Sequence, residues 1–203
     1  MDFSNLNKEL ELAMNLQEGL INRVMKEEDD WRFTIQIVSI FDHILSHLIS
    51  KSLSNDEKLR SIIQLIPIGG IKMGKIKLAK SLLNFTNNEI KFLKEITELR
   101  NTFSHQPHHA FSTITDVFEG FSKEKKKWLK QLLDEFHLNQ EEKISKVSSS
   151  YVSKFFRNCC EQIVSSMRLK LSMLKIKHHH VESKEIELEL YRKLNGHTGI
   201  EDL

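Results

Sequence analysis

Residues 33–49, FTIQIVSIFDHILSHLI, decide the fold class. Apolar side chains recur in this stretch at steps of three and four residues, the repeat of an α-helix with one broad apolar face; they are Phe33, Ile37, Val38, Phe41, Ile44, Leu45, Leu48 and Ile49. The acidic run 27–30 precedes the stretch, and acidic side chains favour a helix amino terminus. We therefore predict a central helix that begins near residue 30.

Similar periodicity extends outward in both directions along the chain. It predicts helices over residues 6–24, 54–66, 71–83, 86–105, 125–136, 147–175 and 185–194, with a loop containing one helical turn over 108–120. Thr86 and Glu89 form a capping box at the start of one helix, and Pro107 predicts that it ends at or just after His105. Seven Gly and two Pro are too few for a fold rich in tight turns.

These patterns predict an all-α fold, an antiparallel helical bundle with a helical carboxy-terminal extension. The bundle is expected to occupy residues 1–176, and 177–203 to be a charged, partly helical tail. The sequence has no uninterrupted apolar run long enough for a membrane span and no signal-peptide pattern, so we expect a cytoplasmic protein without a membrane partner. The adjacent Cys159 and Cys160 are expected to be buried, unpaired thiols.

Charge is distributed unevenly along the chain. Residues 1–30 carry three basic and eight acidic side chains, whereas residues 122–178 carry thirteen and six. Such a basic segment attracts polyanions, or it consists of solvated lysines on outer helix faces. The sequence leaves both interpretations open.

The most informative short motif is Arg100-Asn101-Thr102-Phe103-Ser104-His105. On a regular helix Asn101 and His105 share a face, whereas Arg100 lies at the border of the apolar stripe. Cleaving RNA without a metal requires a base for the ribose 2′-hydroxyl and a cation for the phosphate, which His105 and Arg100 can provide. The alternative is an arginine and a histidine that only cap a helix end.

Glu98-Leu-Arg-Asn-Thr-Phe-Ser-His105 resembles the R-(N/H/D)-x(3 to 5)-H signature of the higher eukaryote and prokaryote nucleotide-binding (HEPN) superfamily. Within that superfamily, the order of Gly69-Gly70-Ile71, Lys75-Ile-Lys-Leu-Ala79 and the R-N-x-F-x-H motif is similar to the mannitol operon repressor branch. The resemblance covers roughly residues 31–105. It implies a helical bundle that dimerises with its motifs facing and, in many members, a metal-independent endoribonuclease that leaves a cyclic phosphate.

The resemblance implies roles for particular residues. His105 would be the base, Arg100 the phosphate contact and Asn101 the positioning group, with Asp42 able to pair with Arg100 and Ser104 standing where the branch has alanine. The further RNA contacts that we expect are Lys72, Lys75, His108 and His109. No cofactor or metal is expected, and Pro107 replaces the tyrosine that partner enzymes modify in related toxins.

Two further functions compete with an endoribonuclease of a toxin, defence or stress-response system. One is a non-catalytic regulator, resembling the mannitol operon repressors, that binds a protein or nucleic acid; the other is a structural adaptor.

Three other short motifs suggest binding sites less clearly. Gly69-Gly70 lacks the spacing and the preceding strand of a phosphate loop. His43 and His47 have a spacing suited to a metal but no evident third ligand, so solvated histidines are the preferred interpretation. Lys125 to Trp128 offer either a stacking and phosphate surface or a buried Trp128 with the lysines on the outside.

Overall fold

The structure, a computed structural model, describes residues 3–53, 57–70, 74–105, 112–127, 131 and 149–196. All the regular elements within these residues are helices, which confirms the all-α class. They are α1 (Phe3–Ala13), α2 (Leu20–Met25), α3 (Asp30–Leu53), α4 (Glu57–Gln64), α5 (Lys75–Leu82), α6 (Asn87–His105), α7 (Ile114–Glu119) and α9 (Ser149–Gly196), and residues 123–127 are also helical.

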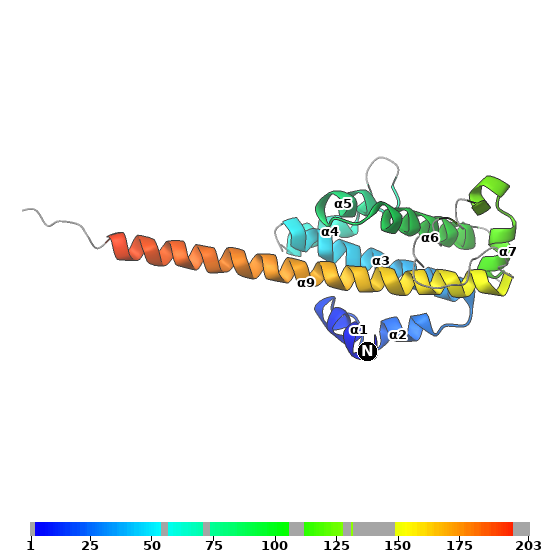
Figure 1. Ribbon diagram of the computed structural model, residues 1–203, viewed down its shortest axis with the longest axis horizontal. Helices are drawn as coiled ribbons and strands as arrows, with labels where there is room; N and C mark the ends of the chain where they lie inside the picture. The colour runs from blue at the N-terminus through cyan, green and yellow to red at the C-terminus, as the bar shows by residue number, and fades with distance from the viewer. Residues whose placement is uncertain are drawn as a thin grey trace, which may run out of the picture.

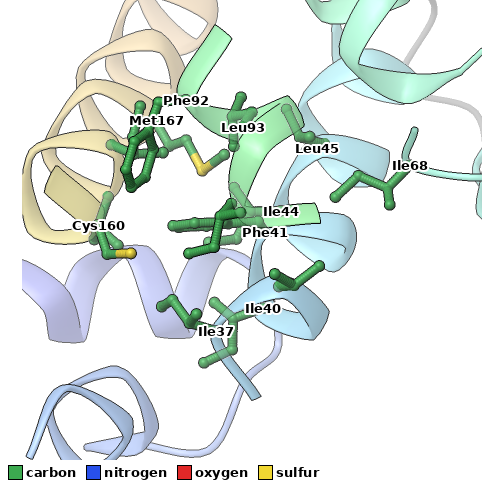
Figure 2. Packing of buried hydrophobic residues seen from close by; sticks show 14 of the residues in the cluster. Ile37, Ile40, Phe41, Ile44, Leu45, Ile68, Phe92, Leu93, Cys160 and Met167 are labelled. Atoms are coloured by element: carbon green, nitrogen blue, oxygen red, sulfur yellow. The ribbon is translucent and has the colours of Figure 1, made fainter. Parts of the chain in front are cut away.

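Helix α3 forms the centre of the body, as its apolar face predicts. It contacts α2, α4, α5, α6 and α9. In Figure 2, Phe41 and Ile44 of α3 lie close to Phe92 and Leu93 of α6, with Met167 and Cys160 of α9 completing the layer. Burial of these side chains removes apolar surface from water, which is the main term that stabilises the bundle.

The three longest helices do not all run antiparallel to one another. Asp30, at the start of α3, bonds Ser153 and Arg157 near the start of α9, and Lys51, near the end of α3, bonds His178 farther along α9. Helices α3 and α9 therefore run in the same direction, side by side in Figure 1. Trp31 of α3 bonds Phe103 near the end of α6, so α6 runs opposite to both.

The prediction of one helix over residues 6–24 is wrong, because the chain breaks it into α1 and α2. Asn15 adopts a left-handed conformation (φ 55°), as does Gly19 (φ 76°). The buried carboxylate of Glu11 accepts hydrogen bonds from the backbone N–H groups of Gly19 and Ile21, both at 2.7 Å. Glu11 thus caps the first turn of α2, and its hydrogen bonds across the break favour two helices over the single one that the apolar repeat predicts.

Helix α9 is longer than the sequence pattern predicts. Instead of ending near Lys175 and being followed by a separate helix over 185–194, it continues without interruption to Gly196. Its buried apolar face extends as far as Leu174, and every side chain from 179 to 190 is exposed. Figure 1 shows this end of α9 projecting well beyond the other helices.

Helix α3 is long and apolar enough, by composition, to cross a membrane. The same test is passed by the central helix of a soluble protein, and 67% of its most apolar window is buried within the body. The fold is therefore compatible with a soluble protein.

Candidate functional site

The motif lies at the carboxyl end of α6, whose start is fixed by the predicted capping box. The Thr86 backbone N–H donates to the Glu89 carboxylate (2.6 Å), and the Glu89 N–H donates to the Thr86 hydroxyl (3.2 Å). Glu89 also accepts from the Ser166 hydroxyl and lies 3.4 Å from the Lys170 ammonium of α9. Burial alone would raise the pKa of Glu89, but bonds from Ser166 and Thr86 and the charge of Lys170 hold it below its ordinary value.

The other end of α6 is tied to α3. The indole Nε1 of Trp31 donates to the Phe103 carbonyl oxygen at 3.3 Å. Because the carbonyls in the last turn of a helix have no partner within the helix, this bond satisfies a group that would otherwise need solvent or a cap. It places the motif beside the amino terminus of α3.

A polar network that the sequence analysis missed organises the same end of the body. The Asp30 carboxylate accepts from the Ile114 backbone N–H (2.9 Å), the Ser153 hydroxyl (2.6 Å) and Arg157 Nη2 (2.7 Å). Arg157 also donates to the Glu27 carbonyl and lies over the Phe33 ring, 4.1 Å from its centroid. The feature of the sequence that points to this network is Arg157, which lies within the apolar repeat of α9, where an arginine requires a partner.

The three motif side chains differ in position around α6. Asn101 and His105 are exposed, whereas Arg100 is half-buried. The helix is regular through His105, so Asn101 and His105 lie about 40° apart around its axis and Arg100 about 100° from Asn101. One copy of the chain therefore presents the amide and the imidazole together and the guanidinium to one side.

Asp42 pairs with a different cation from the one that the resemblance suggests. Its carboxylate lies 2.7 Å from the Lys75 ammonium, which also donates to the Gln64 carbonyl oxygen at 3.3 Å. The Lys75 side chain is only 1% exposed. The prediction of Lys75 as an RNA contact is therefore wrong. Lys75 is instead the buried partner in an ion pair that joins α5 to α3.

The backbone around Lys75 explains why its side chain is buried. The N–H groups of Lys75 and Ile76 donate to the carbonyls of Pro67 and Ile68 at 3.1 and 3.2 Å, which brings the two ends of the Gly-rich segment together. A Cβ atom at Gly74 would lie 2.5 Å from the Gly70 nitrogen, so only glycine fits there. The other predicted RNA contacts, Lys72, His108 and His109, lie outside the described residues.

Carboxylates of α6 hold Lys125, the middle residue of the segment 123–127. Lys125 lies 3.4 Å from Glu95 and 3.1 Å from Glu98, and its ammonium sits 4.4 Å from the centroid of the Phe121 ring. Burial raises the pKa of Glu95, although the charge of Lys125 opposes the rise. Lys125 therefore ties this segment to α6, and Trp128 lies outside the described residues.

His43 and His47 do not form a solvated pair. His43 Nε2 bonds the Met14 carbonyl oxygen at 2.8 Å, and both side chains are partly buried. His47 Nδ1 is buried without a hydrogen-bond partner, and burial together with the nearby charges of Arg60 and Lys51 lowers the pKa of His47 to about 4. Across the described ranges, no group of three or more metal-ligating side chains comes together.

Both cysteines are unpaired and buried, as predicted. Burial raises the pKa of the Cys159 thiol to about 12 and that of Cys160 well above its ordinary value. Because the thiolate is the reactive form, these side chains serve packing rather than catalysis.

A hollow of about 320 Å³ lies between α1, α2 and α9, lined by Asn7, Ile21, Asn22, Met25, Lys26, Glu161, Val164 and Ser165. No side chain of α6 lines it. The motif is accordingly an exposed surface feature at the end of a helix, separate from this hollow.

Comparisons of the chain with protein-family models, with curated proteins and with solved structures gave no match. The class of the protein therefore follows from its own geometry: an all-helical protein that displays Asn101 and His105 at a fixed helix end.

Proposed function

We propose that this chain is a cytoplasmic, HEPN-like, metal-independent endoribonuclease of a toxin, defence or stress-response system. The observation that supports it is the joint exposure of Asn101 and His105 on one face of a regular helix. An imidazole suits proton transfer near neutral pH, and a solvent-facing position allows a polymeric substrate to reach it.

In the proposed reaction, His105 removes the proton from a ribose 2′-hydroxyl. The 2′-oxygen attacks the adjacent phosphorus, the bond from phosphorus to the 5′-oxygen breaks, and the leaving oxygen takes a proton from solvent. The products are a 2′,3′-cyclic phosphate and a 5′-hydroxyl end. Arg100 stabilises the charge that grows on the phosphate, and Asn101 holds the phosphate or the imidazole in place.

The position of Arg100 favours a site that combines two copies of the chain. Because α6 is regular, Arg100 of one copy points away from its own His105, and a second motif facing the first would bring a guanidinium to that imidazole. This arrangement agrees with the facing dimer that the resemblance implies.

The test uses the purified full chain with single-stranded RNA and excess chelator. We expect fragments that end in a cyclic phosphate, and a rate about 10²–10⁴-fold lower for His105→Ala, the usual contribution of a general base. His179→Ala is the matched control, because His179 is an exposed histidine on the projecting end of α9. Intact RNA, or equal cleavage by His105→Ala, would contradict the proposal.

A second candidate, a regulator resembling the mannitol operon repressors, is favoured by the projecting end of α9. A helix whose side chains are all exposed over twelve residues, 179–190, offers a surface to a regulatory protein or a nucleic acid. If the wild-type chain is folded but leaves RNA intact in the assay above, that result would support this function over the first.

A further inference from the structure

The carboxyl end of α9 leaves the body after His178, whose imidazole Nε2 bonds the Lys51 carbonyl oxygen at 2.8 Å. Residues 179–196, the arm, extend for about 27 Å at the rise of an α-helix. Helices gain most of their stability from packing of an apolar face, and the described body provides no such packing for residues 179–190. Residues 179–190 of the arm therefore expose a helix surface on which another helix could pack.

The arm and the adjoining part of α9 carry exposed apolar side chains in a coiled-coil spacing. Leu169, Met173 and Ile176 are 61%, 58% and 70% exposed and lie four and three residues apart. They face away from the body, opposite the buried Leu171 and Leu174. Leu190 continues the seven-residue repeat of Leu169 and Ile176 on the arm itself and is 55% exposed.

The positions between Ile176 and Leu190 in the same repeat are polar: His180, Ser183 and Glu187. The stripe therefore has two apolar ends and a polar centre. Polar residues at seam positions reduce stability and specify register and orientation.

Charge determines which orientation a paired helix would take. Residues 168–180 carry four lysines or arginines, three histidines and no acidic side chain, whereas residues 181–190 carry four glutamates and one lysine. A parallel pair in register would place like charges together. An antiparallel pair places the basic segment of each helix along the acidic segment of the other.

We propose that two copies of this chain pair through α9 as an antiparallel helix dimer with its twofold axis between Val181 and Glu182. In this register Met173 lies opposite Leu190 of the second copy, and Lys177 lies beside its Glu185 and Glu187. The overlap spans residues 169–194, about 39 Å of helix. The contact is isologous, so it closes at two copies.

The bodies leave room for this pairing. The seam lies on the side of α9 opposite the buried face, so the two bodies sit on opposite outer sides of the helix pair. The motif lies at the other end of each body, because Trp31 holds the end of α6 next to the start of α3 and Asp30 joins the start of α9 there. Pairing through the arm is a separate contact from the facing motifs of the proposed nuclease; it leaves the motif uncovered and does not depend on that function.

The first test is the mass of the full chain in solution by light scattering and sedimentation. We expect the Met173→Glu/Leu190→Glu variant to have half the mass of the wild type, because it loses the arm contact, with the same thermal unfolding of the body. Leu188→Glu is the matched control: Leu188 is 56% exposed on the same arm but lies off the seam, so this variant should keep the wild-type mass. A monomeric wild type, or equal masses for the wild type and the double variant, would overturn the proposal.

The second test determines orientation by disulfide formation between variants that each carry one added cysteine. A mixture of Met173→Cys and Leu190→Cys chains should form a cross-linked dimer, whereas neither alone should, because the two positions meet only across an antiparallel pair. Cys159 and Cys160 are buried and do not interfere. Cross-linking of either variant with itself would show parallel pairing and refute the proposal. RNA cleavage is measured separately, so this outcome leaves the nuclease proposal standing.

Discussion

Trp31 holds the candidate site in place through a single side-chain bond to the Phe103 carbonyl, over 3.3 Å and across 72 positions of sequence. The bond joins the first turn of α3 to the last turn of α6, where Asn101 and His105 are displayed. The helix end that carries the motif is therefore fixed to the core helix rather than held only by its own backbone.

Replacing Trp31 with phenylalanine retains an aromatic ring and removes the N–H donor. We expect a loss of about 1 kcal/mol in the free energy of unfolding, the usual net value of such a bond. We also expect faster amide hydrogen exchange in the peptide that contains residues 100–105, because the end of α6 loses its anchor. Arg32→Ala, at an exposed neighbour, is the control, and unchanged exchange in Trp31→Phe would contradict the assigned role.

The ion pair between Asp42 and Lys75 predicts an asymmetry between two variants. Asp42→Ala leaves the buried Lys75 ammonium without its counter-charge and should cost about 3 kcal/mol in the free energy of unfolding. Lys75→Met fills the same space without a charge and leaves the half-exposed Asp42 in contact with solvent, so it should cost much less. Urea denaturation measures both values.

The same pair of variants tests the reassignment of Lys75. Because its ammonium is buried, Lys75→Met should leave RNA affinity and its salt dependence unchanged, whereas the loss of a phosphate contact would flatten the salt dependence. If Asp42→Ala and Lys75→Met lower the free energy of unfolding equally, the Lys75 ammonium is not buried as described.

His47 predicts how stability depends on pH. Its pKa is about 4 in the folded chain, against an ordinary value of 6.5. Between these values the unfolded chain binds a proton that the folded chain does not, so stability rises with pH and is lost as pH falls from about 6.5 towards 4. The cause is burial of the ring, reinforced by Arg60, Lys51 and His43.

His47→Phe removes both the titrating group and the unpartnered Nδ1 atom. Urea denaturation at pH 7.5, 6 and 5 should show a weaker loss of stability on acidification for the variant than for the wild type. His180→Ala, at an exposed histidine, should keep the wild-type dependence. Identical pH dependence for His47→Phe and the wild type would exclude His47 as the source.

The sequence predicts α3, α6 and the inner face of α9 well, because broad apolar stripes set those helices directly. It fails where a polar contact between distant residues decides the geometry. Glu11 ends one helix and starts the next through backbone N–H groups beyond the break, which the apolar repeat does not reveal. The inward apolar stripe of α9 ends near Lys175 and so predicts a break there, although the charged segment that follows still favours helix.

At the candidate site, too, the sequence predicts spacing along one helix but not contacts between distant segments. The spacing of Asn101 and His105 predicts their common face, and the half-buried position of Arg100 follows from its place beside the apolar stripe. The partner of Asp42 could not be predicted, because burial of Lys75 depends on how the segment from Pro67 to Ile76 closes on itself. The contact of Arg157 with Asp30 likewise joins residues that lie 127 positions apart.

The geometry of α6 makes one further prediction about the proposed nuclease. If the guanidinium of one copy serves the imidazole of the other, Arg100→Ala and His105→Ala chains should each be inactive alone. Mixed chains that exchange partners should form dimers in which one composite site keeps both groups.

The measurement is RNA cleavage in chelator by an equimolar mixture after unfolding and refolding together. Random pairing makes half of the dimers mixed, and each mixed dimer retains one of two sites, so activity should recover to about one quarter of the wild type, an order-of-magnitude expectation that treats the two sites as independent. The doubly substituted chain mixed with wild type is the control: its mixed dimers hold no complete composite site, so only the wild-type dimers, about one quarter of the total, stay active, whereas a site within one copy would keep about one half. An inactive mixture would place both groups of the site on one copy, which requires the Arg100 side chain to turn across the face of α6 towards His105.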